Sequence, residues 1–119
     1  MGNYNQLKVW RKSVDLAIDV YRATADYPQD ETFGLRLQMR RAAVSIPSNL
    51  AEGSGRSTPK DYRHFVLQAR GSLLELETQI VISQELEFLD TVKSDALKGR
   101  TAEIGKMLNG LLQYLTPGA

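Results

Sequence analysis

One segment of the chain, Ser45-Ile46-Pro47-Ser48-Asn49-Leu50-Ala51-Glu52-Gly53, places a proline inside a run that otherwise has the pattern of a helix. The run begins with Leu37-Gln38-Met39-Arg40-Arg41-Ala42-Ala43. A proline within a helix removes one backbone hydrogen bond and clashes with the preceding turn, which costs about 3 kcal/mol. Because the segment keeps Pro47 despite this cost, we expect the shape that the proline imposes on the helix to matter.

Apolar residues recur at steps of three and four on both sides of this segment, which predicts four amphipathic helices. Their expected ranges are 5–25, 32–52, 59–88 and 94–115. Thr58 is expected to cap the third helix, and Gly53 is expected to end the second. The residues expected to point inward are, helix by helix, Leu7, Trp10, Val14, Ala17 and Tyr21; Leu35, Met39, Ala42, Ile46 and Leu50; Tyr62, Phe65, Ala69, Leu73, Leu76, Ile80, Ser83 and Glu87; and Leu97, Ile104, Leu108, Leu111 and Leu115.

The length of 119 residues is enough for one hydrophobic core. Short links between long amphipathic helices favour antiparallel neighbours. The sequence therefore predicts an all-α fold, in which residues 1–119 form a single up-down-up-down antiparallel four-helix bundle. The sequence contains no strand pattern, internal repeat or low-complexity tract.

The composition excludes several classes of function. The chain has no cysteine, so it has neither a disulfide framework nor a thiolate nucleophile. Its apolar runs are much shorter than the roughly 20 residues of a membrane span, and its start lacks the pattern of a secretory signal. We therefore expect a cytoplasmic protein with no membrane partner.

Catalytic and metal-binding patterns are also missing. Di-iron bundles need a Glu on each of two helices and a Glu-x-x-His on each of the other two, whereas this chain has a single histidine, His64. Asp61 stands three residues before His64, but it is better explained as part of the N-terminal cap of the third helix. No glycine-rich loop precedes a helix to hold phosphate. The sequence thus predicts no metal, no cofactor and no enzymatic activity.

Charge is segregated along the chain, although the net charge is only +1. In an antiparallel bundle, the start of the first helix, the end of the second and the start of the third share one end. We expect that end to be basic, through Lys8, Arg11, Lys12, Arg56, Lys60 and Arg63. The opposite end should be acidic, through Asp26, Asp30, Glu31, Glu85, Glu87 and Asp90. Arg36 and Arg40 lie one turn apart, a spacing suited to phosphate contact, so they join the basic residues as candidates for nucleic-acid binding.

A polar stripe follows the second helix. Arg41, Ser45, Asn49 and Glu52 are spaced by four, four and three residues, so they share one face. A buried charge has to be paired and hydrogen-bonded, and either Glu52 or Glu75 could pair with Arg41. These five residues are predicted to form a polar network that fixes helix register or a subunit interface, and a small-ligand pocket is the alternative.

The proline-containing segment also carries a resemblance to a known family. Leu7-Lys8-Val9-Trp10, Phe33-Gly34-Leu35, residues 38–53, Gly71-Ser72-Leu73 and Glu75-Leu76-Glu77-Thr78 are similar to the bacterial four-helix bundle proteins, also called 23S rRNA-intervening sequence proteins. The core Ser-Ile-Pro-x-Asn-x-Ala-Glu-Gly is the specific part. The resemblance implies a ring-shaped homopentamer, and a likeness to the accessory variability protein of diversity-generating retroelements, which works with a reverse transcriptase and nucleic acid. It implies no established enzymatic activity.

Two functional hypotheses follow. The first is a non-enzymatic homo-oligomer, a pentamer on the family resemblance, that binds RNA, DNA or a nucleic-acid-handling protein through a basic rim. The second is a protein-binding scaffold in which the segregated charges only orient assembly. Salt separates the two hypotheses, because phosphate binding weakens steeply as salt rises.

Overall fold

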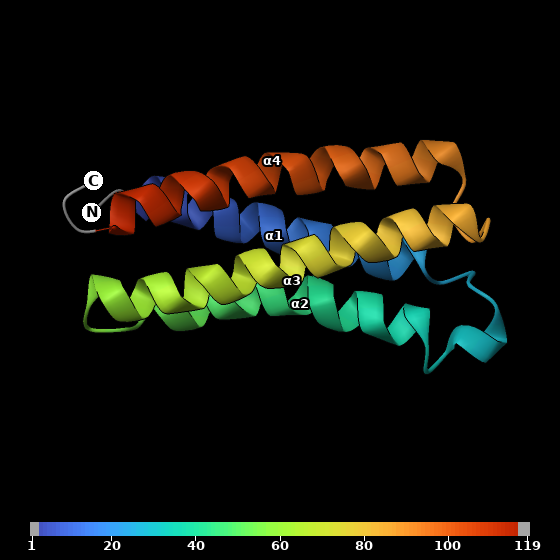
Figure 1. Ribbon diagram of the computed structural model, residues 1–119, viewed down its shortest axis with the longest axis horizontal. Coiled ribbons are helices and arrows are strands. Elements are labelled where there is room, and N and C mark those ends of the chain that lie inside the picture. Colours follow the sequence, from blue (N-terminus) through green and yellow to red (C-terminus); the bar gives the residue numbers. More distant parts are fainter. Residues whose placement is uncertain (1–2, 117–119) are drawn as a thin grey trace.

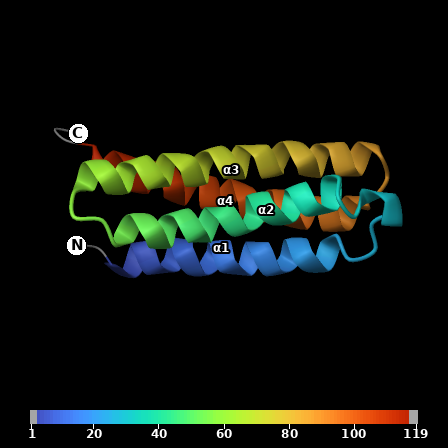
Figure 2. The same cartoon turned by 90° about the horizontal axis from the view of Figure 1, so that it is seen from below.

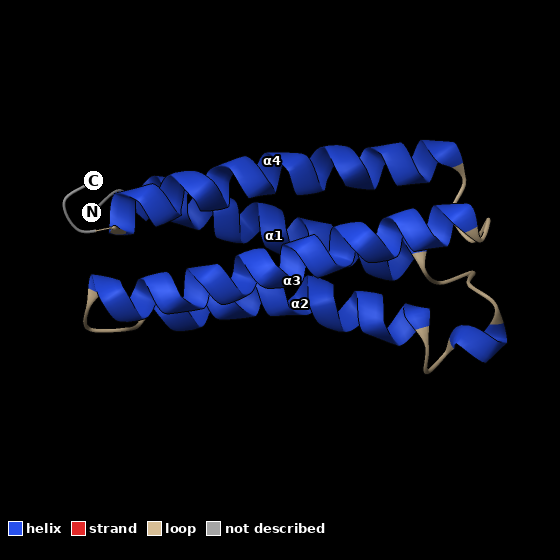
Figure 3. Cartoon of the chain, viewed as in Figure 1, coloured by secondary structure: helices blue, strands red, loops and turns tan. Residues whose placement is uncertain are grey.

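The computed structural model of the chain describes residues 3–116, so the ends of the predicted domain, residues 1–2 and 117–119, lie outside the described residues. The fold consists of the helices α1 Asn3–Ala23, α2 Leu35–Ser54, α3 Pro59–Glu85 and α4 Thr91–Leu115. One turn of 3-10 helix, η1 Gln29–Glu31, lies between α1 and α2. Figure 3 shows that the described part of the chain is helix and connecting loop, without strands.

Consecutive helices run in alternating directions, with their long axes side by side (Figures 1 and 2). The chain measures 47 × 24 × 20 Å. α1 and α3 each pack against α2 and α4; the α2–α3 contact is the most extensive and the α1–α4 contact the least. The predicted all-α four-helix bundle is confirmed. The start of α1, the end of α2, the start of α3 and the end of α4 share one end of it, on the left in Figure 1.

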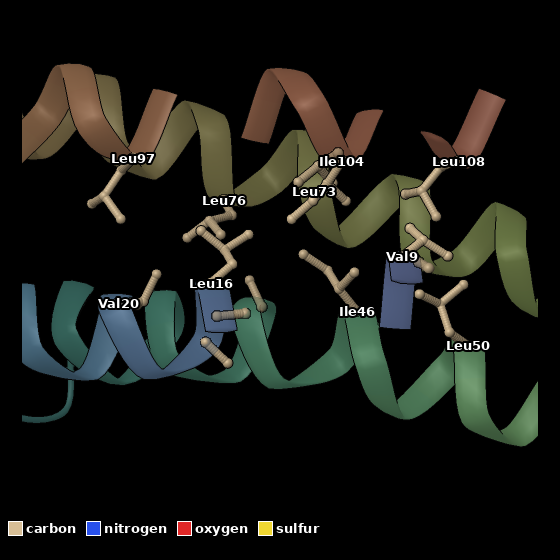
Figure 4. Close-up of a cluster of buried hydrophobic side chains, with 14 of the residues drawn as sticks. Val9, Leu16, Val20, Ile46, Leu50, Leu73, Leu76, Leu97, Ile104 and Leu108 are labelled. Carbon is tan, nitrogen blue, oxygen red and sulfur yellow. The ribbon is translucent and has the colours of Figure 1, made fainter. Parts of the chain in front are cut away.

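The core is a layer of apolar side chains between the helices. Figure 4 shows side chains of α1 and α2 pointing towards those of α3 and α4, among them Leu16, Val20, Ile46, Leu73, Leu76 and Ile104. Each of these six is at most 2 % exposed, and burial of such a side chain contributes about 1.5–3 kcal/mol. The inward faces predicted for the second, third and fourth helices are confirmed, except that Leu35 and Phe65 are only partly buried and Glu87 is exposed.

The inward face predicted for the first helix is correct for Ala17, which is buried, while Trp10 and Val14 are partly buried, and it is wrong for Leu7 and Tyr21. Leu7 is 60 % exposed and Tyr21 is 45 % exposed, whereas Ser13 and Thr24 are fully buried. Hydropathy periodicity passes over Ser13 and Thr24 because they are polar, yet each hydroxyl donates to the carbonyl oxygen four residues earlier, at 2.7 and 2.8 Å. The buried face of α1 consists of Val9, Ser13, Leu16, Ala17 and Val20, and Thr24, the first residue after the helix, continues it. A second apolar stripe of α1 therefore remains at the surface.

The start of α3 at Pro59 and the end of α4 at Leu115 agree with the prediction, and the other helix ends lie two or three residues from it. Local geometry explains two of these differences. Glu87 has a φ of 64°, a left-handed conformation that cannot continue a helix, so α3 ends before it. Asp90 accepts a hydrogen bond from the backbone nitrogen of Lys93 at 2.8 Å, which places the N-cap of α4 earlier than expected. The predicted cap of α3 is confirmed, since Thr58 Oγ1 accepts from the backbone nitrogen of Asp61 at 3.2 Å.

Pro47 does not interrupt α2, which is continuous from Leu35 to Ser54. The proline is buried and lies beside Val14 and Ala17, so it faces α1. Proline has no N–H, and one backbone hydrogen bond of the helix is therefore absent. Packing of α2 against both α1 and α3 offsets this loss and holds the helix together.

Gly53 has a packing role and is not the C-cap that the sequence predicts. α2 continues to Ser54, and its C-cap is Gly55. A Cβ on Gly53 would lie 2.8 Å from Phe65 Cβ and 2.8 Å from Tyr62 Cδ1. Tyr62 is itself buried, and this burial raises the pKa of its hydroxyl. Only glycine allows α2 and α3 to approach so closely next to the turn that joins them.

Replacing Gly53 with alanine should lower the free energy of unfolding by about 1–3 kcal/mol, because the added methyl group overpacks this contact. Gly71→Ala is the matched control. A Cβ on Gly71 would meet nothing within 4 Å, and alanine stabilises a helix relative to glycine by about 1 kcal/mol. Urea unfolding of both variants measures the difference. A Gly53→Ala protein as stable as Gly71→Ala would contradict the packing role.

Candidate functional site

The end of the bundle where α1 begins and α4 ends, on the left in Figure 1, is basic. Residues 3–12, 52–64 and 103–116 carry seven basic and three acidic side chains. The seven basic residues, called the basic end from here on, are Lys8, Arg11, Lys12, Arg56, Lys60, Arg63 and Lys106. At the opposite end, residues 19–40 and 77–98 carry nine acidic and five basic side chains. The bundle is therefore electrically polar along its long axis.

Three residues of the basic end are in ion pairs. The pairs are Arg11–Asp15 at 2.7 Å, Lys12–Glu103 at 3.1 Å and Arg56–Glu52 at 3.1 Å. The hydrogen bond from Arg11 lowers the pKa of the Asp15 carboxyl. The Arg56 guanidinium also lies over the Phe65 ring, 4.6 Å from its centroid. These cations are partly neutralised, so they add less to the positive potential than their number suggests.

The other four residues of the basic end have no ion pair among residues 3–116. Lys8, Lys60 and Lys106 are exposed. Arg63 is half-buried, and its Nε donates to Thr116 Oγ1 at 3.0 Å. Lys106 is not among the predicted basic residues, although the last turns of the fourth helix lie beside the first turns of the first helix in the predicted antiparallel bundle. These four side chains are the cations available to a phosphate at this end.

Arg36 and Arg40 lie towards the acidic end, where they hold α1 to α2. Arg36 Nε donates to Thr24 O at 2.9 Å, and its Nη2 donates to Tyr27 O. Arg40 Nε donates to Thr24 Oγ1 at 2.9 Å and its Nη2 to Tyr21 O at 3.1 Å. Tyr21 O belongs to the last turn of α1, where carbonyl oxygens lack helical N–H partners, whereas Thr24 and Tyr27 lie in the link that follows. The two arginines therefore tie the end of α1 and this link to α2. The structure thus separates both residues from the basic end.

The polar stripe predicted on α2 is assembled only in part. Ser45 Oγ and Ser72 Oγ are 2.8 Å apart, and Asn49 Nδ2 donates to Ser45 Oγ at 2.9 Å. This network joins α2 to α3 directly. Gln79, further along the same side of α3, is 5 % exposed, and its Oε1 has no hydrogen-bond partner.

Arg41, Glu52 and Glu75 are outside this network. Arg41 and Glu75 are both exposed, and no ion pair joins them among the described residues. Glu52 is exposed and pairs with Arg56. The prediction of a buried charge network is therefore wrong for the single chain. Spacing of three and four residues groups side chains on a broad face, and Arg41 falls on the part of that face that points to solvent.

Two apolar surfaces lie on different sides of the bundle. The first, called the α1–α2 groove, has a volume of about 530 Å³ and is lined by Val14, Ala17, Ile18, Tyr21, Arg22, Val44 and Pro47. The second, called the α3 ridge, consists of Leu74, Val81, Ile82 and Leu86, which are 42–56 % exposed. α1 and α3 occupy diagonal corners of the bundle and do not pack together. Exposed apolar side chains that gather on one side of a bundle make these two surfaces candidates for interaction sites.

The comparisons with known proteins agree with this architecture. The sequence profile described as 23S rRNA-intervening sequence protein matches residues 5–110. The chain belongs to the 23S rRNA-intervening sequence protein family. A solved structure of a protein with unknown function, from the S23 ribosomal protein family of Bacteroides thetaiotaomicron, is similar to it with a TM-score of 0.83. The two are 19 % identical over 92 % of this chain and 98 % of that one, so the likeness establishes the fold alone. Curated proteins give no match.

Within this member of the 23S rRNA-intervening sequence protein family, the described residues contain no group of three or more His, Asp or Glu side chains placed to hold a metal ion. His64 is exposed, and its Nε2 lies 2.9 Å from Gln68 Nε2. None of the helices in the described range is both long and apolar enough to cross a membrane. The features that remain to be explained are the basic end and the two apolar surfaces.

Replacing Arg36 with alanine should lower the free energy of unfolding by about 1.5–3 kcal/mol, because hydrogen bonds from a charged donor to the end of α1 are lost. Arg36→Lys should recover little of this lost stability, since the single ammonium group of lysine cannot reproduce the planar guanidinium group with its several N–H donors. Arg41→Ala, at an exposed site of the same helix, should change stability by less than about 0.5 kcal/mol. Urea unfolding measures all three. Equal, small effects at both positions would show that the carbonyl contacts of Arg36 do not stabilise the bundle.

Proposed function

We propose that this chain is a non-enzymatic, cytoplasmic homo-oligomer that binds nucleic acid, or a nucleoprotein partner, through its basic end. The observation that carries the proposal is the segregation of charge. One end has seven basic and three acidic side chains, while the other has five basic and nine acidic ones. A surface with one sign of charge attracts and orients a phosphate backbone.

The two apolar surfaces support self-association. The α1–α2 groove and the α3 ridge are different surfaces. When the groove of one copy contacts the ridge of the next, the ridge of the first copy and the groove of the second remain free to bind further copies. Such a head-to-tail contact repeats until the assembly closes into a ring. Five copies is the number that the family resemblance implies.

A ring of this kind multiplies the basic end. Every copy in a ring is related to the next by rotation about one axis, so neighbouring bundles that stand side by side all point the same way. Cations that are sparse on one chain, such as Lys8, Lys60 and Lys106, then recur around one rim. Several weak phosphate contacts on one strand act together, which raises the overall affinity without any new contact. Phosphate contacts position a nucleic acid without reading its sequence, so little sequence preference is expected.

Val44→Glu in the groove and Val81→Glu on the ridge should each reduce the assembly to a 13.3 kDa monomer. Both side chains are exposed in the single chain, at 41 % and 49 %, so neither change should unfold it. A mixture of the two variants should form a two-chain species, because the intact ridge of one meets the intact groove of the other. Sedimentation equilibrium at micromolar concentration measures both outcomes.

Val92→Glu is the matched control for these variants. Val92 is 80 % exposed at the start of α4, outside both apolar surfaces, so the assembly should be unchanged. If the unmodified protein sediments as a monomer, self-association is wrong. If the mixture of variants stays monomeric, the groove-to-ridge contact is wrong.

Reversing Lys60 and Arg63 to glutamate should weaken binding of mixed-sequence RNA and DNA by at least about tenfold, because each chain loses two phosphate contacts and gains repulsion. The affinity of the unmodified protein should fall steeply between about 50 and 200 mM salt, as counterion release predicts. Fluorescence anisotropy measures both effects, and sedimentation checks that the assembly is intact.

Lys93→Glu with Lys98→Glu is the matched control at the acidic end. Lys93 is exposed like Lys60, and Lys98 is half-buried with one polar partner, Gln84 Oε1 at 2.8 Å, like Arg63. This variant should bind as the unmodified protein does. Absence of binding at about 50 mM salt, or binding that neither salt nor charge reversal changes, would favour the protein-binding scaffold.

A further inference from the structure

A cleft opens between α1 and α4 at the basic end. Its volume is about 590 Å³, which lies within the range of about 300–1,000 Å³ typical of small-molecule sites. The cleft forms where the least extensively packed pair of helices meets, at the left end of the bundle in Figure 1. Val9, Met107 and Leu111 line it with apolar atoms, and Lys8 and Lys106 line it with positive charge.

The lining combines an aromatic ring with positive charge, which suits a ligand that has a planar ring and a negatively charged group. Tyr114 is part of it and is 62 % exposed, so its ring is accessible to a ligand. Lys8 and Lys106 have no ion pair among the described residues, whereas Glu103, the acidic residue of the lining, is paired with Lys12 at 3.1 Å. An aromatic ring beside apolar side chains stacks a nucleobase, and lysines close to it bind the attached phosphate.

We propose that this cleft binds one unpaired nucleotide of a single-stranded RNA or DNA, with the base against Tyr114 and the phosphates on Lys8 and Lys106. The inference rests on the proposed function and deepens it: the basic rim attracts a strand, and the cleft selects a base that is not paired. A base inside a duplex is stacked on both faces and cannot enter unless it is first extruded.

Gly110 offers a direct way to test the cleft. It lines the cleft on α4, and a Cβ on it would meet no atom within 4 Å. Gly110→Leu therefore adds a side chain at the wall of the cleft with no clash at Cβ, and it also favours the helix, because leucine has a higher helix propensity than glycine. Gly99→Leu is the matched control. Gly99 lies on the same helix, away from the cleft, with equally open space around it.

The first arm of the experiment uses AMP and dAMP, followed by saturation-transfer NMR. The unmodified protein and Gly99→Leu should both show transfer to the base protons. Gly110→Leu should weaken this binding by about tenfold or more, the loss expected when one stacked base is removed. Tyr114→Ala should weaken it to a similar extent, whereas Tyr114→Phe, which keeps the aromatic face, should retain it. Equal signals with AMP and dAMP would show that the cleft accepts nucleotides of both RNA and DNA. A signal with AMP alone would assign the cleft to RNA, and a signal with dAMP alone would assign it to DNA.

The second arm compares a single strand of about 12 nucleotides with the duplex of the same sequence. Gly110→Leu should weaken only the single strand, while reversal of Lys60 and Arg63 should weaken both. If the duplex and the single strand bind Gly110→Leu as they bind the unmodified protein, the cleft inference is overturned and the basic rim stands. If neither the single strand nor the duplex binds at about 50 mM salt, the proposed function is overturned. The assignment of the cleft to a nucleic-acid strand is then overturned as well, even if the protein still binds AMP.

Discussion

The close packing of α2 against α3 is the contact on which the rest of the bundle depends. Next to the turn, Gly53 lets the backbone of α2 approach Tyr62 and Phe65. About two turns earlier along α2, Ser45 and Ser72 are joined at 2.8 Å. A hydrogen-bonded polar contact in a packed interface fixes register as well as distance. The hairpin therefore presents a defined apolar surface, and α1 and α4 pack on it with Leu16, Val20, Ile104 and Leu108 fully or almost fully buried.

The positions of α1 and α4 decide the surface chemistry of the molecule. Arg36 and Arg40 hold the end of α1 and the link after it to α2, because they donate to Thr24 O and Tyr21 O. The start of α1 then lies against the end of α4, where the packing is least extensive and the cleft opens. The same antiparallel order brings Lys106 beside Lys8 and so gathers cations from distant parts of the sequence. The cleft and the cations Lys8 and Lys106 occur at the same place, and for this reason the basic end is a candidate site as well as a charged surface.

α1 carries two neighbouring stripes with different roles. Leu16 and Val20 belong to the buried stripe, together with Ser13 and Thr24, whose hydroxyls are satisfied within the helix. Ile18 and Tyr21 belong to the stripe that lines the α1–α2 groove and stays 41–45 % exposed. Pro47 closes the other wall of that groove. The proposed assembly contacts, groove and ridge, thus lie along the sides of the bundle, whereas the proposed nucleic-acid contacts, the cations and the cleft that Lys8 and Lys106 line, lie at one end.

The sequence by itself determined the helical fold, the order of the helices and the segregation of charge, because amphipathic periodicity, capping residues and short links are local properties. It also placed Ile46, Leu76 and Leu108 in the core. It could not say which of two apolar stripes of α1 faces inward, since buried Ser13 and Thr24 look polar until their hydrogen bonds are known. Only the tertiary structure decided that Arg41 and Glu75 point to solvent and that Lys8, Lys106 and Tyr114 line one cleft. The reason is physical: helical spacing assigns a residue to a face, but only the packing of four helices decides what that face meets.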